Sequence, residues 1–276
     1  MSQGKQPAQI WTAVRELEAA AWRDMVAAAP IATCKLLGLR CHKTDNATML
    51  AASAVPRTPF NRCFALSSDW HSNDEEVAEA LTWLRCHAAP GWVLQLDPDE
   101  LGTAASVLSR EGIVASGKGW AKFQWMGSGP GAEQAPPDLE IEAVRDDAMA
   151  LDFADLVLAG FGFPSAAAPW FAELARRDGW SAYIAYVDGK PAGAGAVFCR
   201  LHQAWLGIDT TLTSFRRRGL QLALIERRLR DAGPKFAIAE TALPQSSDLD
   251  GASYRNYSKF GFLNTYNSMN FASVPT

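Results

Sequence analysis

Three consecutive arginines and a glycine stand where an expected strand gives way to an expected helix. The segment reads Arg216, Arg217, Arg218, Gly219, Leu220 and Gln221. The first N–H groups of a helix have no partner within the helix, and the helix dipole adds positive potential there. Because Gly219 has no side chain, a phosphate can approach the backbone closely, and the arginines strengthen the attraction. The segment therefore predicts an anion site; the alternative is a basic surface turn before an ordinary helix.

A hairpin is expected before this loop, and a further helix is expected after it. This set of elements, in this order along the chain, resembles the GNAT acetyltransferase superfamily over residues 139–270. The phosphate loop of that family reads Q/R-x-x-G-x-G/A, which Arg216 and Gly219 match, whereas Gln221 departs from its small final residue. The later helix of the family commonly reads Y-x-K-x-G-F, a pattern matched by Tyr257, Lys259, Gly261 and Phe262. That helix more often carries an asparagine seven residues before the tyrosine, where this chain has Asp250.

The resemblance implies an α/β (α+β) fold of the GNAT type, with a mixed central sheet flanked by helices, and acetyl-CoA as the acyl-donor cosubstrate. One strand splays from its neighbour in this family, and its backbone would hydrogen-bond the pantetheine arm through Ile208, Asp209, Thr210 and Thr211. The backbone of residues 216–221 would hold the pyrophosphate. Tyr257 would protonate the leaving thiolate, because a phenol with an ordinary pKa of ~10 stays protonated at neutral pH; the alternative is an aromatic packed into the core.

An acceptor amine must lose a proton before it attacks, and three residues are candidates for the base: Glu240, Asp209 and His202. Glu240 lies in an apolar run, where burial would raise the pKa of its carboxyl; alternatively it is a strand-end charge facing solvent. Asp209 could equally be a structural hydrogen-bond acceptor. His202 stands in an expected turn, where a histidine is more often a surface residue. The four histidines show no metal-ligand spacing, so no metal is expected.

Together these features predict an N-acetyltransferase that transfers the acetyl group directly to an amine. The acceptor is expected to be a small-molecule or peptide amine, and Trp170 and residues 161–164 are expected to line an apolar acceptor pocket. The alternative is a non-catalytic acyl-CoA or metabolite sensor on a degenerate GNAT scaffold, which Gln221 and Asp250 keep open. Tyr257 favours the enzyme, because a sensor has no need of an acid for a thiolate.

In the second half, two alternating apolar runs surround Asp188-Gly189, which predicts a β-hairpin because both turn positions favour positive φ. Alternation and helical periodicity predict the remaining elements. The expected strands are 139–144, 180–187, 192–199, 205–211, 236–241 and 262–269, and the expected helices are 148–160, 168–177, 219–231 and 253–260.

The first half repeats this kind of order in a shorter form. Helices are expected at 10–29, 74–88 and 99–111 and strands at 92–96 and 122–126, while 48–64 is ambiguous between strand and loop. The order is compatible with a second, shrunken GNAT copy, and residues 108–113 resemble the L-x-x-x-G-F ending of such domains; the alternative is an unrelated accessory domain. No R-x-x-G-x-G/A loop precedes Asp74, so this half is expected to shape the acceptor site and not to catalyse.

The Gly- and Pro-rich segment 127–138 predicts a linker between a first domain, residues 1–127, and a second, residues 138–276. A chain starting near Gly131 is expected to keep the acetyl-CoA site if it folds. The net charge of −4 argues against a nucleic-acid partner. A polar start and no apolar run of ~20 residues indicate a cytoplasmic protein without membrane contact. A monomer or a homodimer is expected. The five cysteines lack CxxC spacing and are odd in number, so free thiols are expected.

Overall fold

The computed structural model describes residues 6–65, 67, 70, 73–127, 138–244 and 251–273. The helices and strands of the first half are α1 (Gln6–Ala27), α2 (Ile31–Leu37), β1 (Leu39–Lys43), β2 (Ala47–Ala52), β3 (Arg62–Ala65), α3 (Asp74–His87), β4 (Val93–Leu96), α4 (Ala104–Arg110), β5 (Ile113–Ala115) and β6 (Trp120–Trp125). Those of the second half are β7 (Leu139–Ala143), α5 (Asp147–Phe161), α6 (Ala168–Leu174), β8 (Trp180–Val187), β9 (Lys190–Arg200), β10 (Gln203–Thr211), α7 (Leu220–Ala232), β11 (Phe236–Ala242), α8 (Ala252–Lys259) and β12 (Leu263–Ser273).

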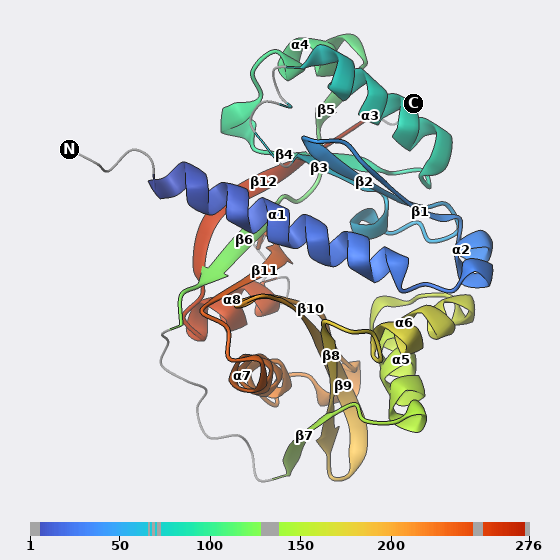
Figure 1. Cartoon of the computed structure of the whole chain (residues 1–276), viewed down its shortest axis with the longest axis vertical. Coiled ribbons are helices and arrows are strands. Elements are labelled where there is room, and N and C mark those ends of the chain that lie inside the picture. Colours follow the sequence, from blue (N-terminus) through green and yellow to red (C-terminus); the bar gives the residue numbers. More distant parts are fainter. Residues whose placement is uncertain are drawn as a thin grey trace.

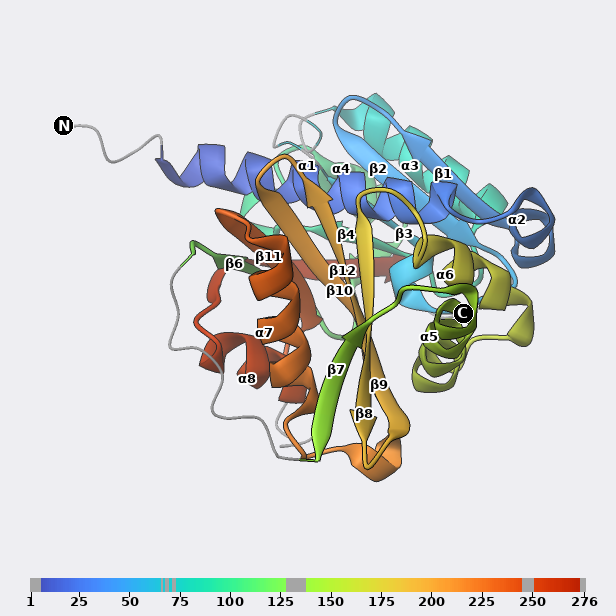
Figure 2. The same ribbon diagram turned by 60° about the horizontal axis from the view of Figure 1, so that its bottom comes forward.

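The strands run through both halves as one mixed sheet. Their order is β1-β2-β3-β4-β12-β6-β11-β10-β9-β8-β7, and β5 pairs with β12 beside this path. β3 pairs with β4 and β10 with β11 in parallel, while the other described pairs are antiparallel. Helices α5 and α6 lie on one side of β8 to β10 and α7 on the other (Figure 2). The expected mixed α/β architecture with flanking helices is therefore confirmed.

The two halves exchange their last strands. β6 ends the first half, yet it pairs with β11 and with the first part of β12, so that Lys122 faces Glu240 across the β6–β11 pair. β12 ends the described chain, and its last part crosses to the first half, where Met269 pairs with Leu96 and Phe271 with Ala115. Figure 1 shows β12 passing from the second half towards β4 and β5. Each half therefore completes the sheet of the other.

Helix α1 packs between the halves. Its residues share one hydrophobic cluster with α5, α6, β8 and β9, so this core belongs to both halves. Asp24 on α1 accepts hydrogen bonds from Arg177 at 2.6 Å and from Trp180 at 2.9 Å. The indole N–H of Trp170 donates to the carbonyl oxygen of Met25 at 2.7 Å. The first half is thereby bound to the helical side of the second half through a region rich in buried aromatic side chains.

Local chemistry explains why several elements begin and end where they do. The Asn73 side chain accepts from the N–H groups of residues 75 and 76 and so caps α3, whose first turn is acidic. Asp146 caps α5 in the same way through residue 149. Asp188 and Gly189 have φ values of 50° and 69°, the backbone that the two-residue hairpin turn between β8 and β9 requires.

The structure confirms the expected strands of the second half and its four helices to within a few residues. The ambiguous segment 48–64 contains most of β2, a short 3₁₀ helix at Thr58–Phe60 and part of β3. The helix expected at 99–111 is wrong at its start: α4 begins only at residue 104, because Gly102 takes a left-handed φ of 50°. All five cysteines are free thiols, as expected. Across the described residues, no helix combines the length and apolarity needed to cross a bilayer.

Candidate functional site

The site begins where β10 separates from β11. The parallel pairing joins residues 203–206 to residues 236–239 and goes no further among the described residues. Beyond this point the pairing of β10 with β9 shifts register between Gly207 and Thr210, and Ile208 has a φ of 58°. This is a β-bulge, which twists a strand and frees backbone groups from the ladder. The splayed strand expected at residues 208–211 is thus present.

Asp209, at this bulge, is held from two sides. The buried Arg228 guanidinium donates to Asp209 Oδ1 and to the carbonyl oxygens of Ala196 at 2.8 Å and Gly207 at 3.2 Å. The Tyr257 hydroxyl donates to Asp209 Oδ2 at 2.5 Å. A buried guanidinium needs such partners, since an unpaired charge away from water costs several kcal/mol. Because Asp209 is 13% exposed while Arg228 is fully buried, the carboxylate is the outermost member of the trio.

The phenol of Tyr257 keeps its proton at every physiological pH. Burial, followed by the negative charge of Asp209, raises the pKa of Tyr257 well above its ordinary value of 10. Its ring packs on Phe123 at 6.0 Å and edge-on against Phe262 at 4.9 Å between centroids. Tyr257 is therefore both a core aromatic and a proton donor to Asp209, so the two interpretations weighed from the sequence describe the same side chain.

The arginine loop precedes a helix, as the sequence predicts. Arg217 and Gly219 have φ values of 65° and 79°, and α7 starts immediately after Gly219 without a side-chain cap. Its first N–H groups are consequently available to an anion. The three arginines of the loop are exposed. Arg218 pairs with Asp138 at 2.5 Å, while the guanidinium of Arg217 has no ion-pair partner within the described part of the chain.

Gln221, which departs from the small residue of the GNAT loop pattern, joins two helices. Its Nε2 donates to Ser253 Oγ at 2.8 Å, and its Oε1 accepts from Asn256 Nδ2 at 2.8 Å. Both partners belong to α8, the helix that carries Tyr257. Gln221 thus fixes the helix that follows the anion loop against the helix that carries the tyrosine. Asp250, the other departure from the family pattern, lies outside the described residues.

Glu240 lies in a buried ion cluster. Its carboxylate accepts from Arg62 Nη1 and Nη2 at 3.0 and 2.8 Å, from Lys122 Nζ at 2.7 Å and from Trp22 Nε1 at 3.0 Å. Burial alone would raise the pKa of Glu240, but the charges of Arg62 and Lys122 outweigh it and hold the pKa far below its usual range. The expectation of a raised pKa was wrong, because both cations come from the first half and are remote in sequence.

Glu18 is the second carboxylate of this cluster, and it behaves in the opposite way. It accepts two hydrogen bonds from Lys122, at 2.7 and 2.9 Å. Arg62 lies farther away, at 3.6 Å. Burial and the nearby charge of Glu240 raise the pKa of Glu18 to about 7. Glu18 is therefore the member of the cluster that takes up a proton near neutral pH.

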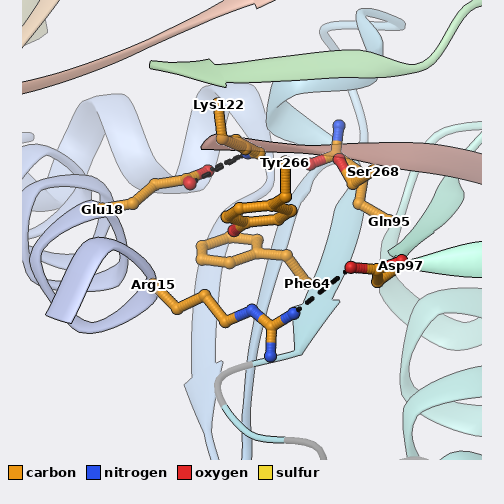
Figure 3. A pocket seen from close by; sticks show the side chains of 8 residues that line it. All are labelled: Arg15, Glu18, Phe64, Gln95, Asp97, Lys122, Tyr266 and Ser268. Atoms are coloured by element: carbon orange, nitrogen blue, oxygen red, sulfur yellow. Dashed lines mark hydrogen bonds and ion pairs between the residues drawn. The ribbon is translucent and has the colours of Figure 1, made fainter. Parts of the chain in front are cut away.

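A small cavity of about 20 Å³ adjoins the cluster. Figure 3 shows Glu18 and Lys122 in its wall, joined by a hydrogen-bonded ion pair. The wall also contains Gln95 and Ser268, whose Nε2 and Oγ atoms have no hydrogen-bond partner among the described residues. A polar cavity of this size has room for about one water molecule, and such waters usually satisfy buried groups of this kind.

A second cavity, of about 440 Å³, lies between the two halves. Its polar wall contains the carboxylates Asp209 and Glu240, and the bulge residue Ile208 lies beside them. Aromatic side chains form much of the remaining wall: Trp22, Phe60, Trp120, Phe161, Phe163, Phe171 and Trp205. Because α1 and the 3₁₀ helix at 58–60 contribute to it, the first half forms part of the wall of this cavity.

The structure brings some of the expected site residues to this cavity and leaves others away from it. Phe161 and Phe163 line it, whereas Trp170 packs beneath and does not. Tyr257 stands behind Asp209, and the loop 216–221 lies outside the lining. His202 is exposed in the turn between β9 and β10, outside the lining too.

Sequence reasoning missed the cations of the site. Arg228 carries a signal, since it stands four residues after Leu224 on the apolar face of α7 and is buried there. Arg62 and Lys122 lie in apolar strands, which also marks them as buried charges in need of partners. The lining residue Arg57, next to Pro56, gives no comparable signal.

Several solved structures with a similar fold are GNAT proteins by their descriptions. A GCN5-related N-acetyltransferase from Kribbella flavida has a TM-score of 0.58 over 89% of this chain and 95% of that protein, at 17% identity. One from Sphaerobacter thermophilus has a TM-score of 0.59 over 84% and 82%, at 12% identity. A tandem GNAT protein from the clavulanic acid biosynthesis pathway has a TM-score of 0.54 over 99% and 97%, at 15% identity. No protein-family model matches the sequence, and no curated protein matches it.

These similarities agree with the geometry. The tandem protein covers nearly the whole chain, so the first half is included in the similarity and is no unrelated accessory domain. The splayed strands β10 and β11, the glycine loop before α7 and the helix of Tyr257 follow in the order expected of the second copy. The chain therefore has a tandem GNAT fold.

Proposed function

We propose that the protein is an N-acetyltransferase that uses acetyl-CoA and transfers the acetyl group directly to an amine. The observation that carries this proposal is the opening between β10 and β11 beside a cavity of about 440 Å³, with the Asp209 carboxylate in the cavity wall. The GNAT fold supports acyl transfer in general, and the particular donor and the amine acceptor are part of the proposal.

Two features of the second half fit the donor. The bulge at residues 208–210 frees backbone groups of β10, which can then bind an extended arm such as pantetheine. The start of α7 offers uncapped N–H groups next to exposed arginines, which suits a pyrophosphate. Acetyl-CoA supplies the activated acetyl group when it is bound. We assign its binding to Ile208, Asp209, Thr210, Thr211 and residues 216–221, with Tyr257 close by.

Tyr257 and Asp209 act as one proton-handling pair. Tyr257 is protonated at neutral pH, so it holds a proton that the departing thiolate can take, while its raised pKa makes it a weaker acid than an ordinary phenol. Asp209 holds the hydroxyl in place, and Arg228 holds Asp209. In this pair Tyr257 is the general acid, and the Asp209 carboxylate orients it. The same carboxylate is a hydrogen-bond acceptor in the cavity wall.

Asp209 is also the better of the two candidates for the group that takes the proton of the amine. The Asp209 carboxylate is 13% exposed in the cavity wall beside Tyr257, whereas both oxygens of Glu240 are already occupied by donors from the first half. His202, exposed in its turn, has no role in this scheme.

We further propose that residues 138–276 carry the catalytic groups and that residues 1–127 shape the acceptor side. Trp22, Arg57 and Phe60 of the first half line the cavity, which supports this division. Arg62 and Lys122 hold Glu240 from the same side. The exchanged strands β6 and β12 make the two units interdependent.

A sensor that binds an acyl-CoA without turnover is the second candidate. The observation in its favour is that both carboxylates at the cavity already have several partners, which suits a static binding site. The two functions separate in one experiment, in which acetyl-CoA binding is measured by calorimetry and release of free CoA is followed with a panel of amines. Release with at least one amine, abolished by Asp209→Asn, supports the enzyme. Binding without release from any amine supports the sensor, and no binding overturns both.

A further inference from the structure

The apolar wall of the large cavity is a fixed stack of aromatic rings. Phe163 stacks on Phe171 with centroids 5.5 Å apart and an interplanar angle of 11°, and on Phe161 at 5.6 Å and 18°. Phe60 meets Phe163 edge-on at 5.1 Å and 76°, which ties the first half to this stack. Rings held by one another in this way lose little entropy when a flat apolar ligand packs against them. The wall therefore suits an acceptor with an aromatic or similarly broad apolar part.

The charged side chains in the cavity wall have ion-pair partners, with one exception among the described residues. Asp209 is paired with the buried Arg228, and Glu240 is paired with the buried Arg62 and Lys122. Arg57 also lines the cavity, but it is exposed, and no described side chain accepts a hydrogen bond from its guanidinium. The donor groups of Arg57 are thus available to a ligand, and its guanidinium is a positive charge in the lining without an ion-pair partner among the described residues.

The guanidinium of Arg57 lies over the end of α5. A Cβ atom at Gly162 would lie 2.8 Å from Nη2 of Arg57, so the guanidinium rests directly over this glycine. Gly162 takes a left-handed φ of 66° and closes the C-terminal turn of α5, where the helix dipole favours a positive charge. Gly162 stands between Phe161 and Phe163 in the sequence, which places the cation beside the aromatic wall.

We propose that the acceptor is a small aromatic or broad apolar amine that also carries a carboxylate, and that Arg57 binds this carboxylate. The proposal rests on the N-acetyltransferase function proposed above and names its substrate class. A guanidinium presents a fork of N–H donors that matches the two oxygens of a carboxylate. The cavity volume of about 440 Å³ is that of a small-molecule site. Phosphate groups of the donor are assigned elsewhere, because the loop 216–221 does not line this cavity.

The test compares amines that differ only by a carboxylate. One pair is L-phenylalanine and 2-phenylethylamine, and a second pair with a wider spacing is 4-(aminomethyl)benzoate and benzylamine. For each compound, binding to the full chain in the presence of CoA is measured by calorimetry, and free CoA release from acetyl-CoA gives kcat/KM. A charge-assisted hydrogen-bond pair favours the carboxylate member of at least one pair by roughly 10- to 100-fold in affinity and in kcat/KM.

Variants of Arg57 identify the residue responsible. Arg57→Gln should reduce the preference for the carboxylate member to about twofold or less, because it weakens that member more than the partner amine. Arg57→Lys should restore part of the preference. Arg40→Gln, at an exposed arginine on β1 of the same half, is the matched control and should change nothing. A dipeptide with an aromatic second residue tests whether a peptide is accepted as well as a single amino acid. A kcat/KM for the dipeptide equal to that for L-phenylalanine would contradict the assignment to a single small amine.

The outcomes separate this inference from the proposed function. Arg57-dependent binding of an aromatic amino acid without any CoA release would support the carboxylate site and overturn the enzyme. Acetylation of both members of each pair at equal rates, unchanged in Arg57→Gln, would overturn the inference and leave the enzyme standing. Failure of every carboxylate-bearing compound to bind at millimolar concentration would also overturn the inference.

Discussion

The hydroxyl of Tyr257 donates to the carboxylate of Asp209 at 2.5 Å, although the two residues are 48 positions apart in the chain. This contact joins α8 to the bulge of β10, at the point where β10 leaves β11. The tyrosine is buried and the aspartate reaches the cavity, so any proton that leaves Tyr257 does so beside a carboxylate. The contact is the basis of the first prediction.

Replacement of Tyr257 by phenylalanine is expected to lower turnover about 10²- to 10⁴-fold, the usual value of a general acid, with acetyl-CoA affinity unchanged. The ring contacts with Phe123 and Phe262 remain, so the fold should persist. Tyr254→Phe on the same helix is the matched control, because Tyr254 also packs on Phe123 and is only partly buried. Steady-state kinetics with calorimetric affinities measure both effects. Unaltered turnover in a variant whose chemical step limits the rate would contradict the assignment.

Gly219→Glu is expected to abolish acetyl-CoA binding. The change puts a carboxylate at the uncapped start of α7, where the pyrophosphate is assigned, and a side chain at a φ of 79°. Gly233→Glu is the matched control, because Gly233 has a φ of 53° at the other end of the same helix, and nothing described lies within 4 Å of where its Cβ would stand. Calorimetry should give one acetyl-CoA per parent chain and per Gly233→Glu chain. A second site that survives Gly219→Glu would show that the first half binds acetyl-CoA as well.

The exchanged strands change what is expected of a shortened chain. A chain starting near Gly131 lacks β6, which lies between β11 and β12, and it leaves the last part of β12 without β4 and β5. We therefore expect this chain to be unfolded or aggregated, instead of keeping the acetyl-CoA site as the sequence alone suggested.

Cleavage of the linker tests the same feature without removing any strand. A protease site placed within residues 127–138 and cut after folding should leave two fragments that stay together in gel filtration and unfold in one transition. The uncut variant is the control. Fragments that separate at neutral pH without denaturant would show that each half is complete by itself.

Local signals in the sequence predicted the elements, and they could not predict how distant elements pair. The hairpin at Asp188-Gly189 follows from two residues that tolerate positive φ, so four positions are enough to place it. The pairing of Met269 with Leu96 joins residues 173 positions apart, and alternation in a strand says nothing about its partner.

The candidate site shows the same limit. Asp209 and Tyr257 were identified because their segments match a family pattern, whereas the environment of Glu240 depends on Arg62, 178 positions away, and Lys122, 118 positions away. The apolar neighbours of Glu240 in the sequence correctly indicate burial. They do not reveal the cations that reverse the effect of that burial on its pKa.

We expect the stability of the folded chain to depend on pH through the titration of Glu18. Its pKa is about 7 in the folded chain, against an ordinary value of 4.5, so the folded state binds more protons than the unfolded state between these pH values. The free energy of unfolding that Glu18 contributes is therefore fully present below about pH 4.5 and falls as the pH rises towards 7. A pKa shift of this size corresponds to a loss of unfolding free energy on the order of 3 kcal/mol once the pH has risen above the folded-state pKa.

Glu18→Gln removes this titration, since an amide has no proton to lose in this range. Urea unfolding of the parent and the variant at pH 5, 6, 7 and 8 should show the parent losing stability relative to Glu18→Gln as the pH rises to 7, and no further change above about pH 8. Glu240 does not disturb the comparison, because its lowered pKa keeps it ionised throughout this range. Glu16→Gln, at an exposed position of the same helix, is the control and should follow the parent. A constant difference in unfolding free energy between the parent and Glu18→Gln at all four pH values would show that Glu18 is ionised throughout, and that Lys122 and Arg62 offset its burial as they do for Glu240.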